Sequence, residues 1–108
     1  MNCFTTIMYL SIMNHELDTK NAIVKILEEL LIDEYPQIMK IEVTSEVYDF
    51  NTIKHYRYTV YLGIKYDDMS LMSYEEINDM KKEAKRYCKY VMGKNEKVES
   101  VVMYDPRN

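Results

Sequence analysis

The sequence predicts a small α+β protein, built as a two-layer sandwich of a sheet with helices on one face. Three observations lead to this fold class. Two segments carry the apolar spacing of amphipathic helices, others alternate with the two-residue period of a strand, and only two Gly and two Pro interrupt the chain. A length of 108 residues suits a single domain over residues 1–108 with one core.

The first helix is predicted over residues 18–32, where apolar residues recur every three or four positions. Asp18 or Thr19 is the expected N-cap, and Pro36 lies where the helix has to end. The apolar stripe that would face the core comprises Ile23, Ile26, Leu27, Leu30 and Leu31.

The second helix, predicted over residues 73–93, has the clearest signals in the chain. Ser73 and Glu76 have the spacing of a capping box, and Gly93 stands where a left-handed C-terminal cap is expected. Its apolar stripe comprises Ile77, Met80, Ala84, Tyr87 or Cys88, and Val91.

Two long strands are predicted between these helices. From Ile38 onward, one face of the first strand is apolar, with Met39, Ile41, Val43 and Val47. Over residues 55–66 the inward positions hold Tyr56, Tyr58, Val60, Leu62, Ile64 and Tyr66. Most of the tyrosine rings in this segment therefore belong to the core or its rim, and Tyr61 alone lies on the polar face.

A short strand is predicted over residues 97–104 and ends at Asp105-Pro106. Its inward face has two possible assignments, because Val98 and Val102 compete with Val101 and Met103.

The N-terminal residues decide the topology. In residues 3–12 the even positions include Phe4, Met8, Leu10 and Ile12, which predicts a further strand. The order then becomes βαββαβ, the ferredoxin-like arrangement of a four-stranded antiparallel sheet with two helices on one face. Alternatively, Met13 is the true start and residues 1–12 are an extension or a tail, which leaves the order αββαβ.

The cysteines and the apolar runs of the sequence indicate the cellular compartment of the protein. Cys3 and Cys88 lack the spacing of a zinc or redox motif, which favours reduced thiols. The apolar N-terminal run lacks the basic residues and cleavage site of a signal peptide, and no run approaches the roughly 18 apolar residues of a membrane span. We therefore expect a cytoplasmic protein without a membrane partner.

Catalytic motifs are absent from the sequence. Gly63 and Gly93, the only glycines, cannot build a phosphate-binding loop, and neither His15 nor His55 stands in a recognisable nucleophile motif. The string Tyr66-Asp67-Asp68 could hold a metal only with a third carboxylate, so we interpret the aspartates as polar turn residues. We expect a protein that is not an enzyme and that has neither a cofactor nor a metal.

Two surfaces are candidate binding sites. The polar sheet face mixes charges with Tyr and suits a protein partner; its candidate residues, with the two turn aspartates, are Glu42, Glu46, Tyr61, Asp67 and Asp68. The second helix carries a basic face that could bind nucleic acid or could be an ordinary solvated face: Lys82, Lys85, Arg86 and Lys89. The net charge of −4 favours the protein partner.

The leading functional hypothesis is a non-enzymatic protein-binding module. Composition narrows it further, because small acidic chains rich in residues with AT-rich codons (Lys, Ile, Asn, Tyr) are common among phage and mobile-element accessory genes. Such genes include anti-CRISPR proteins and other inhibitors of host defence nucleases, which cover a basic, nucleic-acid-processing partner. The alternatives are a nucleic-acid binder that uses the basic helix and a homodimeric ligand-sensing module that pairs through a sheet edge.

Overall fold

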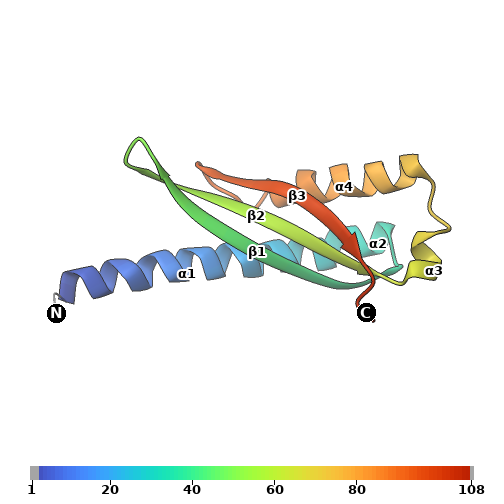
Figure 1. Cartoon of the computed structure of the whole chain (residues 1–108), viewed down its shortest axis with the longest axis horizontal. Helices are drawn as coiled ribbons and strands as arrows, with labels where there is room; N and C mark the ends of the chain where they lie inside the picture. Colours follow the sequence, from blue (N-terminus) through green and yellow to red (C-terminus); the bar gives the residue numbers. More distant parts are fainter. Residues whose placement is uncertain (1–2, 108) are drawn as a thin grey trace.

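The computed structural model describes the backbone of residues 3–107 and the side chains of residues 15–107. A three-stranded mixed sheet is packed against helices, so the α+β class is confirmed (Figure 1). The elements run in the order α1 (Cys3–Ile26), η1 (Leu27–Leu31), α2 (Ile32–Glu34), β1 (Ile38–Phe50), β2 (Ile53–Ile64), α3 (Tyr66–Met69), α4 (Tyr74–Cys88) and β3 (Glu96–Tyr104).

The strand predicted over residues 3–12 is wrong, because this segment is the first part of α1. No Gly or Pro occurs between Cys3 and Glu34, so a helix once nucleated gains one hydrogen bond for each residue added, without interruption. Asp18 and Thr19 consequently lie inside the helix and do not cap it.

The ferredoxin-like order is not confirmed. Within residues 3–107 the sheet has three strands in the order β1-β2-β3, with β1 antiparallel and β3 parallel to β2. In the ferredoxin-like order the N-terminal strand lies between the equivalents of β2 and β3. Because that segment is helical here, β3 pairs directly with β2, and the α3–α4 crossover makes the pair parallel.

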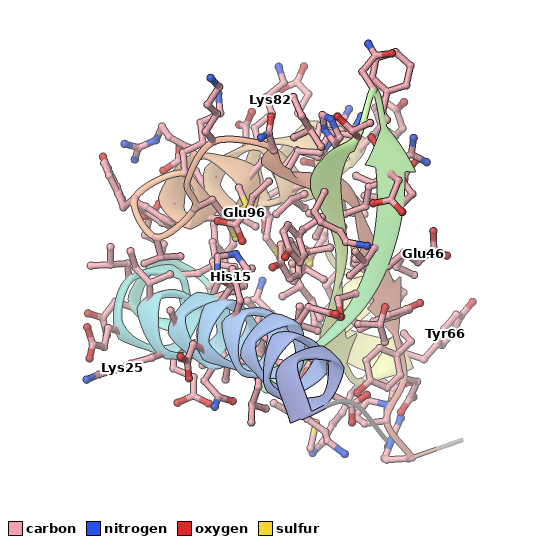
Figure 2. The ribbon with its side chains drawn as sticks, turned by 90° about the vertical axis from the view of Figure 1, so that its left-hand side faces the viewer. His15, Lys25, Glu46, Tyr66, Lys82 and Glu96 are labelled. Atoms are coloured by element: carbon pink, nitrogen blue, oxygen red, sulfur yellow. The ribbon has the colours of Figure 1, made fainter. Side chains whose placement is uncertain are left out.

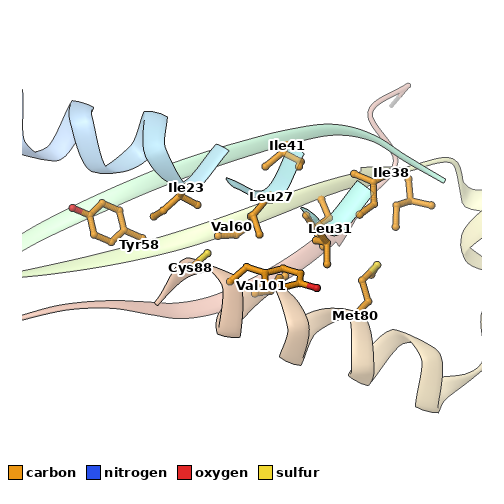
Figure 3. Packing of buried hydrophobic residues seen from close by; sticks show 14 residues of the cluster. Ile23, Leu27, Leu31, Ile38, Ile41, Tyr58, Val60, Met80, Cys88 and Val101 are labelled. Carbon is orange, nitrogen blue, oxygen red and sulfur yellow. The ribbon is translucent and has the colours of Figure 1, made fainter. Parts of the chain in front are cut away.

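The core lies between one face of the sheet and the helices α1, η1 and α4 (Figure 3). Ile23, Leu27 and Leu31 follow one another at four-residue intervals, and the wider turn of the π-helix η1 keeps all three fully buried. Leu30 of the predicted stripe is 39% exposed. Opposite these residues lie the buried side chains Tyr58, Val60, Leu62, Ile64, Met80, Ala84, Tyr87, Cys88 and Val101.

Two irregularities in strand pairing correct the predicted strand faces. The β1 register shifts between Ile38 and Lys40, so Ile38 and Ile41 are both buried while Met39, predicted to face inward, is 54% exposed. A similar shift follows Val98 in β3, which lets both Val98 and Val101 contact the core. The inward face of β3 therefore takes one residue from each predicted set, Val98 from the first and Val101 from the second.

The turns follow the sequence signals in part. Ser73 caps α4 by accepting a hydrogen bond from the Glu76 N–H at 3.1 Å, as predicted. Gly93 does not have positive φ, so the predicted left-handed cap is wrong. Positive φ occurs instead at Asn95 (66°) and at the β1–β2 turn, Asn51 (53°) and Thr52 (62°).

Truncation of Leu27 tests the assignment of the core. Leu27→Ala should lower the free energy of unfolding by about 2–5 kcal/mol, because it opens a cavity between η1 and the sheet. The matched variant Leu30→Ala, three residues away and on the exposed side, should change it by less than about 1 kcal/mol. Urea unfolding followed by circular dichroism measures both; equal effects would show that η1 packs through a different stripe.

Candidate functional site

Among the described residues the helices pack on one face of the sheet, and we call the opposite side the open face. Strand pairing arranges its side chains in cross-strand rows, one of which is Glu42, Tyr61 and Val102. Figure 2 shows Glu46 on the side of the sheet away from His15 and Glu96. The open face comprises Lys40, Glu42, Thr44, Glu46, Tyr48, Phe50, His55, Arg57, Thr59, Tyr61, Lys97, Ser100, Val102 and Tyr104, with Glu99 beside Arg57.

An aromatic ladder occupies the hairpin end of the open face. The rings of Tyr48 and His55 stack at 5.2 Å between centroids, and Phe50 meets His55 edge-on at 5.9 Å. The Arg57 guanidinium lies 4.2 Å from the Tyr48 ring centroid and reaches Glu99 at 3.8 Å. This end is consequently ordered by its own stacked contacts.

A hollow of about 410 Å³ lies toward the other end of the open face. Its walls are the rings of Tyr61 and Tyr104, which meet edge to face at 6.3 Å between centroids. A hydrogen bond from Lys40 Nζ to Glu42 Oε1, at 2.7 Å, is the main cause that lowers the pKa of Glu42 and keeps it ionised. The lining residues are Glu42, Thr44, Tyr61, Val102 and Tyr104.

The five residues predicted to bind protein do not form one patch. Glu42, Glu46 and Tyr61 share the open face, whereas Asp67 and Asp68 lie in α3, beyond the end of β2. Asp68 lines a separate hollow beside the α3–α4 turn. The open face therefore holds three of the five; Glu42 and Tyr61 are cross-strand partners, whereas Glu46 pairs with Arg57.

Tyr66 was predicted to face the core, but it is 66% exposed because β2 ends before it. Its backbone N–H donates to Asp105 Oδ2 at 2.9 Å, which holds the start of α3 to the end of β3. Arg107 also binds Asp105, at 2.8 Å, and its hydrogen bonds lower the pKa of that carboxyl strongly.

The basic face of α4 is only partly available. Lys82, Lys85 and Lys89 are exposed. Arg86 is bound to Glu83, with a nitrogen–oxygen distance of 2.6 Å, and lies 4.7 Å from the Tyr87 ring centroid. Three of the four predicted cations therefore have their charge directed to solvent.

A polar cluster on the helix side of the sheet was not among the predicted sites. The Glu96 carboxylate, whose side chain is only 4% exposed, accepts hydrogen bonds from the Tyr58 hydroxyl at 2.8 Å and the Gly93 N–H at 2.7 Å. His15 Nε2 lies 3.1 Å from the same carboxylate (Figure 2). The cluster thus joins α1, β2 and the start of β3. An acid at an inward-facing position of β3 was its only signal in the sequence.

Hydrogen bonds decide the charge of Glu96. Burial of the carboxylate acts to raise the pKa of Glu96. This effect is outweighed by hydrogen bonds from Gly93, Tyr58 and Thr19 and by the nearby His15, so the pKa is lowered. The same burial raises the pKa of Tyr58, which stays a hydrogen-bond donor. The cluster is therefore a structural clasp whose groups are already satisfied.

Cys88 is not a reactive thiol. It is fully buried, and burial raises its pKa to about 12. The Cys3 side chain lies outside the residues whose side chains are described.

Acidification tests the clasp. Since the folded-state pKa of Glu96 is lowered from an unfolded value of about 4.3, its ionised form stabilises the fold above that pH, and this contribution is lost as the pH falls through the folded pKa. Glu96→Gln should therefore cost about 1–3 kcal/mol at pH 7, and its difference from the parent should shrink in acid.

Urea unfolding at pH 7 and at acidic pH values measures this difference. The control is Glu99→Gln, on the same strand, whose side chain is 48% exposed and should contribute less than about 0.5 kcal/mol. A pH-independent loss in Glu96→Gln would contradict the assigned charge.

No group of three or more His, Cys, Asp or Glu side chains is placed to hold a metal ion in the part of the chain whose side chains are described. Over residues 3–107, no helix combines the length and the apolar character needed to cross a membrane. In comparisons with known proteins, the chain matches no protein-family model, no curated protein and no solved structure.

Proposed function

We propose that this chain is a protein-binding module whose contact surface is the open face of the sheet. One observation carries the proposal: α1, η1 and α4 all pack on the same side, so the other side of three paired strands has no cover from the described residues. Half-buried Tyr48, Tyr61 and Tyr104 rise from this surface. Rings fixed in a sheet supply contact area while losing little conformational entropy on binding.

The charges of the open face also favour a protein partner. Three cations (Lys40, Arg57, Lys97) stand against three acids (Glu42, Glu46, Glu99), so the face is balanced although the whole chain has a net charge of −4. A nucleic-acid-binding sheet combines its exposed rings with a basic surround. A balanced, ring-bearing surface is typical of a protein interface instead.

The basic face of α4 supports a second candidate function, nucleic-acid binding. Lys82, Lys85 and Lys89 are exposed and lie on the side of α4 that does not contact the core. Such binding would weaken steeply with added salt, because salt reduces the free energy gained when the lysines displace counterions from the phosphates. The acids Glu75, Glu76 and Asp79 at the other end of the helix weigh against it.

The narrower hypothesis of an inhibitor of a host defence nuclease, of the anti-CRISPR kind, is supported by composition. It makes a specific demand on the partner, which should be a basic nucleic-acid-processing enzyme bound in stoichiometric amount. Identification of the partner therefore tests it directly.

A crossed pair of charge reversals separates the two candidate surfaces. Tagged protein is used to capture partners from a lysate of the source organism, with one arm treated with nuclease. Glu42→Lys/Glu46→Lys on the open face should reduce the captured protein by about tenfold or more in both arms, because two favourable charges become repulsive. Lys82→Glu/Lys85→Glu on α4 should leave it unchanged.

The opposite pattern, with partners that disappear on nuclease treatment and depend on the two lysines, would transfer the function to α4 and nucleic acid. Both double variants alter exposed side chains, and equal melting temperatures would show that each is folded.

A further inference from the structure

We infer that the hollow on the open face receives the guanidinium group of an arginine side chain of the partner protein. The inference rests on the proposed function and adds the chemistry that the partner has to present. The hollow extends over all three strands. Its lining residues Glu42, Tyr61 and Val102, one from each strand, form one cross-strand row.

The polar groups that line the hollow are all oxygens. Glu42 contributes a carboxylate, Thr44 a hydroxyl, and Tyr61 and Tyr104 their phenol groups, while Val102 is apolar. A guanidinium group has five N–H donors and no acceptor, so it can donate to the Glu42 carboxylate and to exposed hydroxyl oxygens of the lining at the same time. The Glu42 carboxylate would repel an anion, and it could not accept a hydrogen bond from a ligand that carries only carbonyl oxygens.

The Tyr104 hydroxyl lies close to the Glu42 carboxylate. Its oxygen is buried, and no hydrogen-bond partner for it lies among the described residues. Burial, and next the charge of nearby Glu42, raise the pKa of Tyr104, so the group is a neutral phenol. The buried oxygen is closed to solvent, so a ligand in the hollow meets the ring of Tyr104 and the Glu42 carboxylate beside it.

The ring geometry suits a planar cation. The rings of Tyr61 and Tyr104, which line the hollow, stand at 83° to each other, so they do not stack face to face. The chain itself packs guanidinium groups on tyrosine twice, with Arg57 4.2 Å from the Tyr48 centroid and Arg86 4.7 Å from the Tyr87 centroid. The attraction is the cation–π interaction, to which Val102 adds an apolar surface for the arginine methylenes.

Lys40 competes for Glu42, but weakly. Its Nζ contacts Oε1 of the carboxylate, and the two side chains are 58% and 47% exposed. An ion pair this exposed is worth about 0–1 kcal/mol, so a bidentate guanidinium can share or displace it.

The test measures binding of N-acetyl-arginine-methylamide to the full-length ¹⁵N-labelled protein by amide chemical shifts. The matched probe is the citrulline derivative, which has nearly the same shape and no charge. We expect the arginine derivative to shift the amides of Glu42, Tyr61, Val102 and Tyr104 and to bind at least about fivefold more tightly than the citrulline derivative.

Two variants sharpen the assignment. Glu42→Gln should weaken arginine binding about fivefold or more, whereas Glu46→Gln, on the same strand and the same face, should leave it unchanged. Unperturbed spectra outside the hollow show that both variants are folded. Equal affinities for arginine and citrulline, equal effects of the two variants, or shifts outside the hollow would each overturn the inference.

The inference and the proposed function fail separately. If a protein is captured through the open face but the arginine derivative does not bind the hollow, the inference falls and the proposed function stands. If the derivative binds as expected while no protein depends on the open face, the hollow is an arginine site and the proposed function falls.

Discussion

The packing of η1 and α4 against the inner face of β2 is the contact on which the rest of the structure depends. The long-helix residues Ile23, Leu27 and Leu31 and the α4 residues Met80, Ala84 and Cys88 pack with Val60 and Leu62 in one core, and all of them are fully buried. Since both helices use the same side of the sheet, the burial that stabilises the fold also leaves the other side uncovered. The candidate site is thus a by-product of how the core forms.

Local patterns were enough to predict much of this fold. The helix at residues 74–88, its Ser73 cap and the three strands follow from periodicity and turn residues, because these depend on neighbours in the sequence. The N-terminal helix was mistaken for a strand, because the even positions of residues 3–12 are mostly apolar although the segment is helical. Bulges were also beyond prediction, because one extra residue in β1 or β3 breaks the two-residue period without any sequence mark.

The candidate site was predictable to a smaller extent. Alternation placed Glu42, Glu46 and Tyr61 on one face, but the hollow needs Val102 and Tyr104 from β3, and their alignment depends on a parallel pairing that was not foreseen. Asp67 and Asp68 were grouped with this face only because they follow β2 in the sequence. The clasp around Glu96 joins residues 81 positions apart, so no local pattern could have revealed it.

The two-residue turn at Asn51 and Thr52 has a consequence for how this protein can change during evolution. Both residues have positive φ, which is unusual for a β-branched residue such as Thr52, and the turn starts the β1–β2 register with the pair Phe50 and Ile53. A single residue inserted within β2 would send Tyr58 and Val60 to solvent and bring Arg57 and Thr59 against the helices. The hairpin can therefore lengthen or shorten by whole cross-strand pairs beside the turn, and such changes alter the reach of the open face while every row behind them stays in place.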